Sequence, residues 1–307
     1  FWTYRMFAID PQAKYFDLIE RSYLNLALAA VSLDGDKYFY ENMLRRTKKL
    51  DYELCWPLHR TEAISSFCCP PNLMRTIAES AQYAYTFSED TIWTGLYGDC
   101  RTEICLENGA SFVLSQHTQY PYDGEILFTA EEVTTDRPFK LRLRIPGWAG
   151  SGRIEWGQEC MELGKQDGGT YVELSLASPK DMRVRLVLDM PARMTKAHPY
   201  VEECVGQVAV ERGPLVYCME SVDVEAESLD QVMIDPSSPV EVRMTEIKGR
   251  KIPVLDMTVR RAEPWGEDLY KEYQSEPAGQ VKARMIPYYA WGNRGKGEMT
   301  VWMPLAR

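Results

Sequence analysis

The feature that most limits the fold of this chain is a change in the spacing of its apolar residues near residue 88. Before this point apolar residues recur every three or four positions, and after it they alternate with polar ones, as in Phe139–Ile145. Alternation predicts strands with one buried face, because neighbouring side chains on a strand point to opposite sides. Similar segments recur at short intervals as far as residue 188, which is typical of an antiparallel β-sandwich.

The rest of the chain fits this division into a helical part and a β part. Apolar residues between Tyr15 and Ala30 predict an amphipathic helix, and a second helix is expected from about Leu73 to Tyr85. A further β-rich region begins at residue 208, and a closing strand is expected at 299–303. With 307 residues the chain is long enough for about two domains.

Chemistry is suggested by one short motif, Cys68-Cys69-Pro70-Pro71-Asn72. The prolines favour a stiff corner, with a helix beginning at Pro71 or Asn72. A thiolate near the positive end of a helix has a lowered pKa, which favours nucleophilic attack or metal binding. The alternative is a pair of apolar thiols buried at a helix start, and the pattern alone favours neither interpretation.

Composition excludes several classes of function. The net charge of −10 and the scattered basic residues argue against a nucleic-acid partner. The sequence has no apolar run near the ~20 residues that cross a membrane. The other cysteines form no regular framework, and a chain of this size needs no disulfides, so we expect a reduced, cytoplasmic protein.

Several motifs in series resemble glycoside hydrolase family 127, the β-L-arabinofuranosidase family once known only as a domain of unknown function. The cysteine motif is the specific one, and the resemblance covers nearly the whole chain. The others are, in order, Ser32-Leu33-Asp34-Gly35 with Phe39-Tyr40, Leu143–Trp148, Glu211–Tyr217, and Pro287–Trp291 with Asn293-Arg294-Gly295.

The resemblance implies a fold of mixed class, α then β. Residues 1–87 would be the last helices of an (α/α)6 catalytic barrel, and two antiparallel β-sandwich domains would follow. Residues 88–195, joined by the closing strand in 290–307, would form the first sandwich, and residues 196–289 the second.

The resemblance also implies an unusual retaining mechanism. A cysteine thiolate attacks the sugar, a Zn²⁺ ion held by three cysteines and a glutamate keeps it ionised, and another glutamate is the acid/base. Cys68 matches the nucleophile and one zinc ligand, and Cys69 matches a second ligand. Tyr40 matches an aromatic residue of the sugar pocket. His59, in the stretch before the cysteines, is a weaker pocket candidate.

The remaining site residues are expected upstream of this chain, either in a second polypeptide or in an absent N-terminal half. Glu53-Leu54-Cys55 has the spacing of the family's Glu-x-Cys pair but lies in the wrong segment, so Cys55 is a weak candidate ligand. The expected protein is a glycosidase that cleaves terminal arabinofuranosides. It would be inactive as the isolated chain and could form a homodimer. The alternatives are a non-catalytic carbohydrate-binding or assembly subunit and a metal-binding redox protein.

Overall fold

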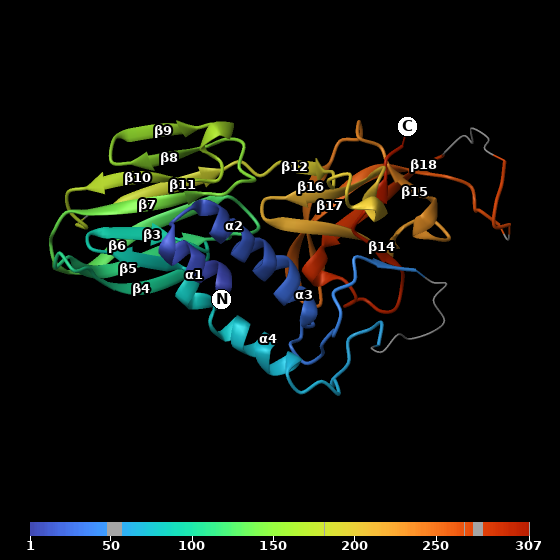
Figure 1. Ribbon diagram of the computed structural model, residues 1–307. Coiled ribbons are helices and arrows are strands. Elements are labelled where there is room, and N and C mark those ends of the chain that lie inside the picture. The colour runs from blue at the N-terminus through green and yellow to red at the C-terminus, as the bar shows by residue number, and fades with distance from the viewer. Residues whose placement is uncertain (48–56, 181, 267, 273–278, 307) are drawn as a thin grey trace. The chain divides into compact units, whose positions relative to one another are not determined.

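The computed structural model describes residues 1–47, 57–180, 182–266, 268–272 and 279–306. The chain divides into two compact units. The first unit consists of Phe1–Tyr23 and Met74–Pro191, and the second of Leu24–Leu73 and Ala192–Arg307. The predicted mixed composition is confirmed, with a few helices and a larger share of strands (Figure 1). Within the described residues, no helix has the length and apolar character needed to cross a membrane.

The first unit begins with helices α1 (Trp2–Ile9) and α2 (Ala13–Arg21). Their apolar sides meet in an aromatic cluster of Phe7, Phe16, Tyr83 and Trp93. The rings of Phe7 and Phe16 lie edge to face with their centroids 4.7 Å apart, a favourable geometry for aromatic pairs. The periodicity of the first helices therefore reflects burial against the sheet that contains Trp93.

Two sheets make up the rest of the first unit. Phe112 of the larger sheet contacts Phe139 of the smaller one, with ring centroids 5.0 Å apart. The smaller sheet has the order β10 (Thr170–Leu176), β7 (Phe139–Ile145), β3 (Thr91–Thr94), β2 (Tyr85–Ser88). The larger has the order β4 (Cys100–Cys105), β5 (Ser111–Thr118), β6 (Glu125–Thr135), β11 (Arg183–Leu188), β8 (Gly152–Trp156), β9 (Glu159–Leu163).

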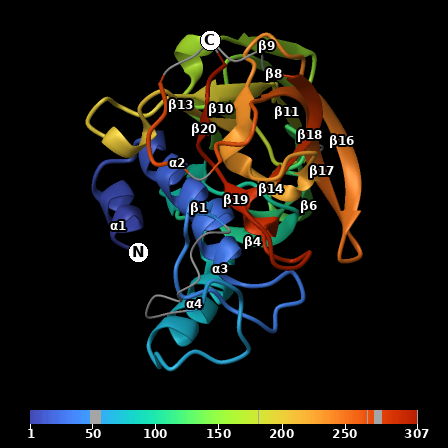
Figure 2. The ribbon, with the colours of Figure 1, turned by 90° about the vertical axis from the view of Figure 1, so that its right-hand side faces the viewer.

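The second unit is built on a ten-stranded sheet, in which β14, β18 and β17 lie side by side (Figure 2). The main path runs β1 (Arg45–Arg46), β19 (Met299–Thr300), β14 (Leu215–Val224), β18 (Gly279–Pro287), β17 (Arg250–Arg261), β15 (Val232–Ile234). Attached to it are β16 (Glu241–Ile247), β13 (Gln207–Arg212), β12 (Ala192–Thr195) and β20 (Met303–Pro304).

The second unit also contains the segment that leads to the cysteines. Helix α3 (Leu28–Ala30) follows a π-helical stretch, Ser22–Ala27. Residues 31–44 and 57–68 form turns, bends and isolated bridges rather than helices. Helix α4 (Cys69–Ala78) begins in this unit, and the chain continues through a 3₁₀ turn at Ser80–Tyr83.

The predicted partner of the closing strand is wrong. β19 pairs with β1 and β14, and β20 pairs with β13, so the end of the chain joins the second unit instead of the sheets formed by residues 88–195. The physical reason is burial, since Met299, Val301 and Met303 are almost fully buried in the core of this unit. β12, expected at the end of the first sandwich, also pairs with β13.

Candidate active site

The two cysteines lie next to each other at the start of α4. Both are free thiols, Cys68 exposed and Cys69 half-buried, and their Sγ atoms are 3.5 Å apart. A disulfide requires sulfurs at about 2.05 Å, so the pair is reduced in this structure. The two sulfur atoms therefore lie close together at the start of this helix.

The start of α4 differs slightly from the prediction. The helix begins at Cys69, ahead of the expected start at Pro71 or Asn72. Prolines are tolerated here because the first N–H groups of a helix have no intrahelical acceptor to lose. Asn72 secures the turn, since its backbone N–H and its Nδ2 both donate to the carbonyl oxygen of Cys68, at 3.3 and 2.7 Å.

Ser66 lies beside both thiols. Its Oγ lies 3.4 Å from Sγ of Cys68 and 3.3 Å from Sγ of Cys69. The hydrogen bond with Ser66, followed by that with Cys69, lowers the pKa of Cys68. Ser66 was not predicted as a site residue, because its only signal in the sequence is a hydroxyl group two positions before the cysteine motif.

Tyr40 reaches the same place from a distant part of the sequence. The charge of Cys69 and a hydrogen bond to it raise the pKa of Tyr40, so its hydroxyl keeps its proton beside the thiols. His59 is half-buried in the stretch that leads to the cysteines. Cys55 lies outside the described residues.

The thiols fit part of a zinc site. Tetrahedral zinc with Zn–S bonds of about 2.3 Å separates two sulfur ligands by about 3.8 Å, close to the 3.5 Å between Cys68 and Cys69. Thiolates are also ligands that zinc favours. Among the described residues, however, no group of three or more histidine, cysteine, aspartate or glutamate side chains could hold a metal ion. The described residues therefore bring together two of the four ligands that a tetrahedral zinc site would need.

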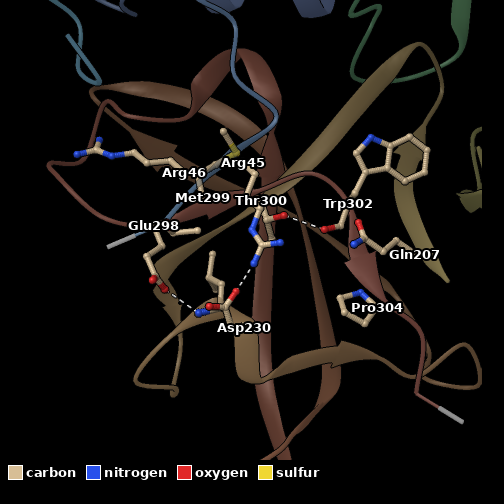
Figure 3. A pocket seen from close by; sticks show the side chains of 11 residues that line it. Arg45, Arg46, Gln207, Asp230, Glu298, Met299, Thr300, Trp302 and Pro304 are labelled. Atoms are coloured by element: carbon tan, nitrogen blue, oxygen red, sulfur yellow. Dashed lines mark hydrogen bonds and ion pairs between the residues drawn. The ribbon is translucent and has the colours of Figure 1, made fainter. Parts of the chain in front are cut away.

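The second unit also contains a pocket between β1, β13, β19 and β20 (Figure 3). Its volume is about 60 Å³, against the ~300–1,000 Å³ of ordinary ligand sites. Several of the polar groups that line it already have partners, since Arg45 forms an ion pair with Asp230 and Glu298 accepts a hydrogen bond from the N–H of Leu229 at 2.7 Å. The candidate residues Tyr40, His59, Cys68 and Cys69 do not line this pocket, so it is not the candidate active site.

Comparison with known proteins agrees with the motifs. The β-L-arabinofuranosidase GH127 catalytic-domain model matches residues 1–82, the GH127 middle-domain model residues 91–190, and the family 127 C-terminal-domain model residues 192–304. The last range includes the closing strands, in agreement with their pairing in the second unit.

Individual relatives point the same way. A non-reducing end β-L-arabinofuranosidase of Bifidobacterium longum is 30% identical over 97% of this chain and 46% of its own length. A solved glycoside hydrolase superposes with a TM-score of 0.91 at 40% identity, over 99% of this chain and 50% of that one. A GH127 β-L-arabinofuranosidase from Geobacillus stearothermophilus gives 0.88 at 32% identity, over 99% and 48%.

The chain thus spans about half the length of the relatives it matches. Three models of one family match it in succession along nearly all of its sequence, and the specific cysteine motif falls within the part matched by the catalytic-domain model. The chain therefore belongs to glycoside hydrolase family 127.

Proposed function

We propose that this chain is the C-terminal part of a retaining, cysteine-dependent glycosidase that removes terminal β-L-arabinofuranosides from plant glycans or glycoproteins. The observation that carries the proposal is the exposed Cys68 thiol with its lowered pKa, 3.5 Å from the thiol of Cys69. The names of the relatives support the substrate class, because two of them are β-L-arabinofuranosidases.

In this proposal Cys68 is the nucleophile. Its thiolate attacks the anomeric carbon, the bond from that carbon to the leaving oxygen breaks, and a thioglycosyl intermediate forms on the sulfur. A carboxylic acid protonates the leaving oxygen and then, as carboxylate, takes a proton from the water that releases the sugar. Tyr40, beside Cys69, lines the sugar subsite, and His59 is a weaker candidate for the same role.

Cys68 and Cys69 would also hold Zn²⁺. A bound zinc ion supplies positive charge that keeps a coordinating thiol deprotonated at neutral pH. Ser66 contributes in the same direction from within this chain, since its hydrogen bond lowers the pKa of Cys68. The two described thiolates leave room for two more ligands in a tetrahedral site.

The remaining ligands and the acid/base would come from the rest of the barrel, in the same polypeptide or in a second one. Large apolar side chains of the first helices support this, because Trp2 is 72% exposed and Ile9 is 78% exposed. Phe67, directly before Cys68, is 91% exposed. We call this chain together with that upstream barrel segment the completed protein.

A second candidate is a non-catalytic carbohydrate-binding or assembly subunit. The observation that favours it is the half site, since the described residues offer no cluster of three metal-ligating side chains. The two candidates differ in whether Cys68 is needed for hydrolysis by the completed protein.

The deciding experiment is hydrolysis of a β-L-arabinofuranoside by the completed protein and by its Cys68→Ser variant. A serine hydroxyl without an adjacent base is a poor nucleophile, so turnover should fall to the background level. Cys105→Ser is the matched control, because Cys105 is another exposed free thiol. Full activity in Cys68→Ser would exclude the proposed mechanism, and inactivity of the unmodified completed protein would favour the non-catalytic subunit.

A further inference from the structure

A buried arginine lies in the stretch that leads to the cysteines. Arg60 is 7% exposed, and its Nη2 donates to the carbonyl oxygen of Ala29 at 2.8 Å while its Nη1 donates to the carbonyl oxygen of Trp291. Its guanidinium carbon lies 4.3 Å from the ring centroid of Phe39. Burial lowers the pKa of Arg60 to about 10, which still leaves the side chain charged at neutral pH.

Phe39 and Trp291 complete the arrangement. Their rings are stacked, with centroids 4.5 Å apart and planes within 12° of parallel, and the Trp291 side chain is almost fully buried. We call Arg60, Phe39 and Trp291 the clamp. Its three members come from three separate parts of the sequence. The clamp therefore joins segments that no local secondary structure connects.

The clamp holds both segments that reach the candidate site. A two-way backbone bridge connects Tyr38 and Thr61, at 2.8 and 2.9 Å, directly beside Phe39 and Arg60. Tyr40 follows Phe39 in the sequence, and the stretch from Thr61 leads to Cys68 and Cys69. The segments that carry the tyrosine and the thiols are therefore fixed relative to each other next to the clamp.

The same C-terminal segment also fixes the chain beyond Tyr40. The hydroxyl of Tyr288 donates to the carbonyl oxygen of Met43 at 2.7 Å, and the N–H of Val301 donates to that of Leu44 at 2.9 Å. Tyr40 is thus held between Phe39 on one side and Met43 on the other. Its own side chain is partly exposed and meets Cys69.

From this geometry we propose that Arg60 and Trp291 are positioning residues, which act through Phe39 to hold Tyr40 and the cysteine pair in the arrangement that reacts. The role rests on the proposed function of Cys68. It assigns a role to the C-terminal aromatic motif around Trp291, which takes no direct part in the proposed chemistry. Small displacements of reacting groups cost rate, and a shift of about 1 Å can lower turnover about 100-fold.

The test compares Arg60→Lys with Arg193→Lys in the completed protein. A lysine at position 60 keeps the charge but loses the planar fork that reaches two carbonyl oxygens. Arg193 also uses both arms of its guanidinium in the second unit, donating to the carbonyl oxygen of Gly213 at 2.9 Å and to the carboxylate of Glu211 at 2.7 Å. It contacts neither Phe39 nor Trp291 through these bonds, so Arg193→Lys is the matched control.

We expect kcat of Arg60→Lys to fall about 10- to 100-fold with little change in KM, because a displaced nucleophile is penalised mainly in the transition state. Arg193→Lys should keep kcat within about twofold of the unmodified protein. Phe39→Leu is the second variant, since it removes the stacked ring without changing a charge. It tests the positioning role if Arg60→Lys does not fold.

Hydrogen exchange provides a readout of position that is independent of turnover. In Arg60→Lys, backbone amides in peptides covering 38–44 and 60–69 should exchange about tenfold faster, because the free energy of local opening is lower. The peptide covering 207–217 should be unchanged, and Arg193→Lys should show the reverse pattern. Unchanged kcat and exchange in both Arg60→Lys and Phe39→Leu would overturn the proposal, provided Cys68→Ser is inactive. An active Cys68→Ser would instead overturn the proposed function on which it rests.

Discussion

Nη1 of Arg144 lies 2.6 Å from a carboxylate oxygen of Asp17, and the same guanidinium forms an ion pair with Glu20. This joins β7 to α2 inside the first unit, with the Arg144 side chain fully buried. The Nε of Arg144 donates to the carbonyl oxygen of Gly95 at 2.9 Å. A buried cation of this kind is tolerated because each nitrogen of the guanidinium donates to an acceptor.

The first prediction concerns Glu20, which also accepts hydrogen bonds from the hydroxyl of Tyr120 at 2.6 Å and from the indole N–H of Trp148 at 3.3 Å. Glu20→Gln removes the more deeply buried of the two counter-charges of Arg144, leaving only Asp17, and should lower the free energy of unfolding by up to about 3–5 kcal/mol. Urea denaturation measures the change. The control is Glu241→Gln, which breaks an exposed pair with Arg243 and should cost under about 1 kcal/mol. Equal losses in the two variants would contradict the role assigned to Glu20.

The second prediction concerns the close packing at Gly95. A Cβ atom there would lie 2.2 Å from the carbonyl oxygen of Tyr83 and 2.4 Å from the ring of Phe16. Both groups are buried, so Gly95→Ala should destabilise the first unit by about 1–3 kcal/mol through overpacking. Gly98→Ala is the matched control, because a Cβ atom at Gly98 meets nothing within 4 Å. Thermal unfolding of both variants measures the difference in stability. An unchanged stability of Gly95→Ala would show that Tyr83 and Phe16 can move to accommodate the added methyl group.

The third prediction is a pH dependence in the second unit. Hydrogen bonds from Arg284 to Asp256, at 2.7 and 3.1 Å, lower the pKa of Asp256 below its usual 3.8. A lowered carboxyl pKa contributes stability above pH 3.8, and that contribution is lost as the pH falls through the folded-state pKa. Asp256→Asn should therefore cost about 1 kcal/mol at pH 7, and the difference should vanish in acid. A loss that stays the same from pH 7 to pH 2 would mean that charge is not its cause.

Local patterns in the sequence predicted much of the strand content, and the reason is physical. The alternation in Phe139–Ile145 predicts β7 with its bounds, because one side of each strand must be buried. The Cys68-Cys69 pair is equally local, so the sequence predicts that two sulfurs lie together at a helix start. Such features need no knowledge of distant residues.

Pairing between distant segments was not predictable in the same way. An alternating sequence pattern predicts that the closing segment forms strands, but it does not determine which strands β19 and β20 pair with. The two-residue strand β1 has too short a pattern to be recognised. Arg60 looks like an ordinary polar residue of an irregular stretch, and its burial depends on Phe39 and Trp291, far away in the sequence.

The last prediction concerns the metal. Two thiolates satisfy half of a tetrahedral zinc site, so this chain alone should bind Zn²⁺ weakly and the completed protein should bind about one ion. Cys69→Ser should lower zinc content and turnover together, because it removes a ligand without removing the nucleophile. Cys105→Ser, which changes an exposed thiol in the first unit, should alter neither. Metal analysis after dialysis against a chelator, combined with the hydrolysis assay, measures both quantities. Stoichiometric zinc in the isolated chain would mean that its own residues complete the site, and full zinc content in Cys69→Ser would remove Cys69 from the ligand set.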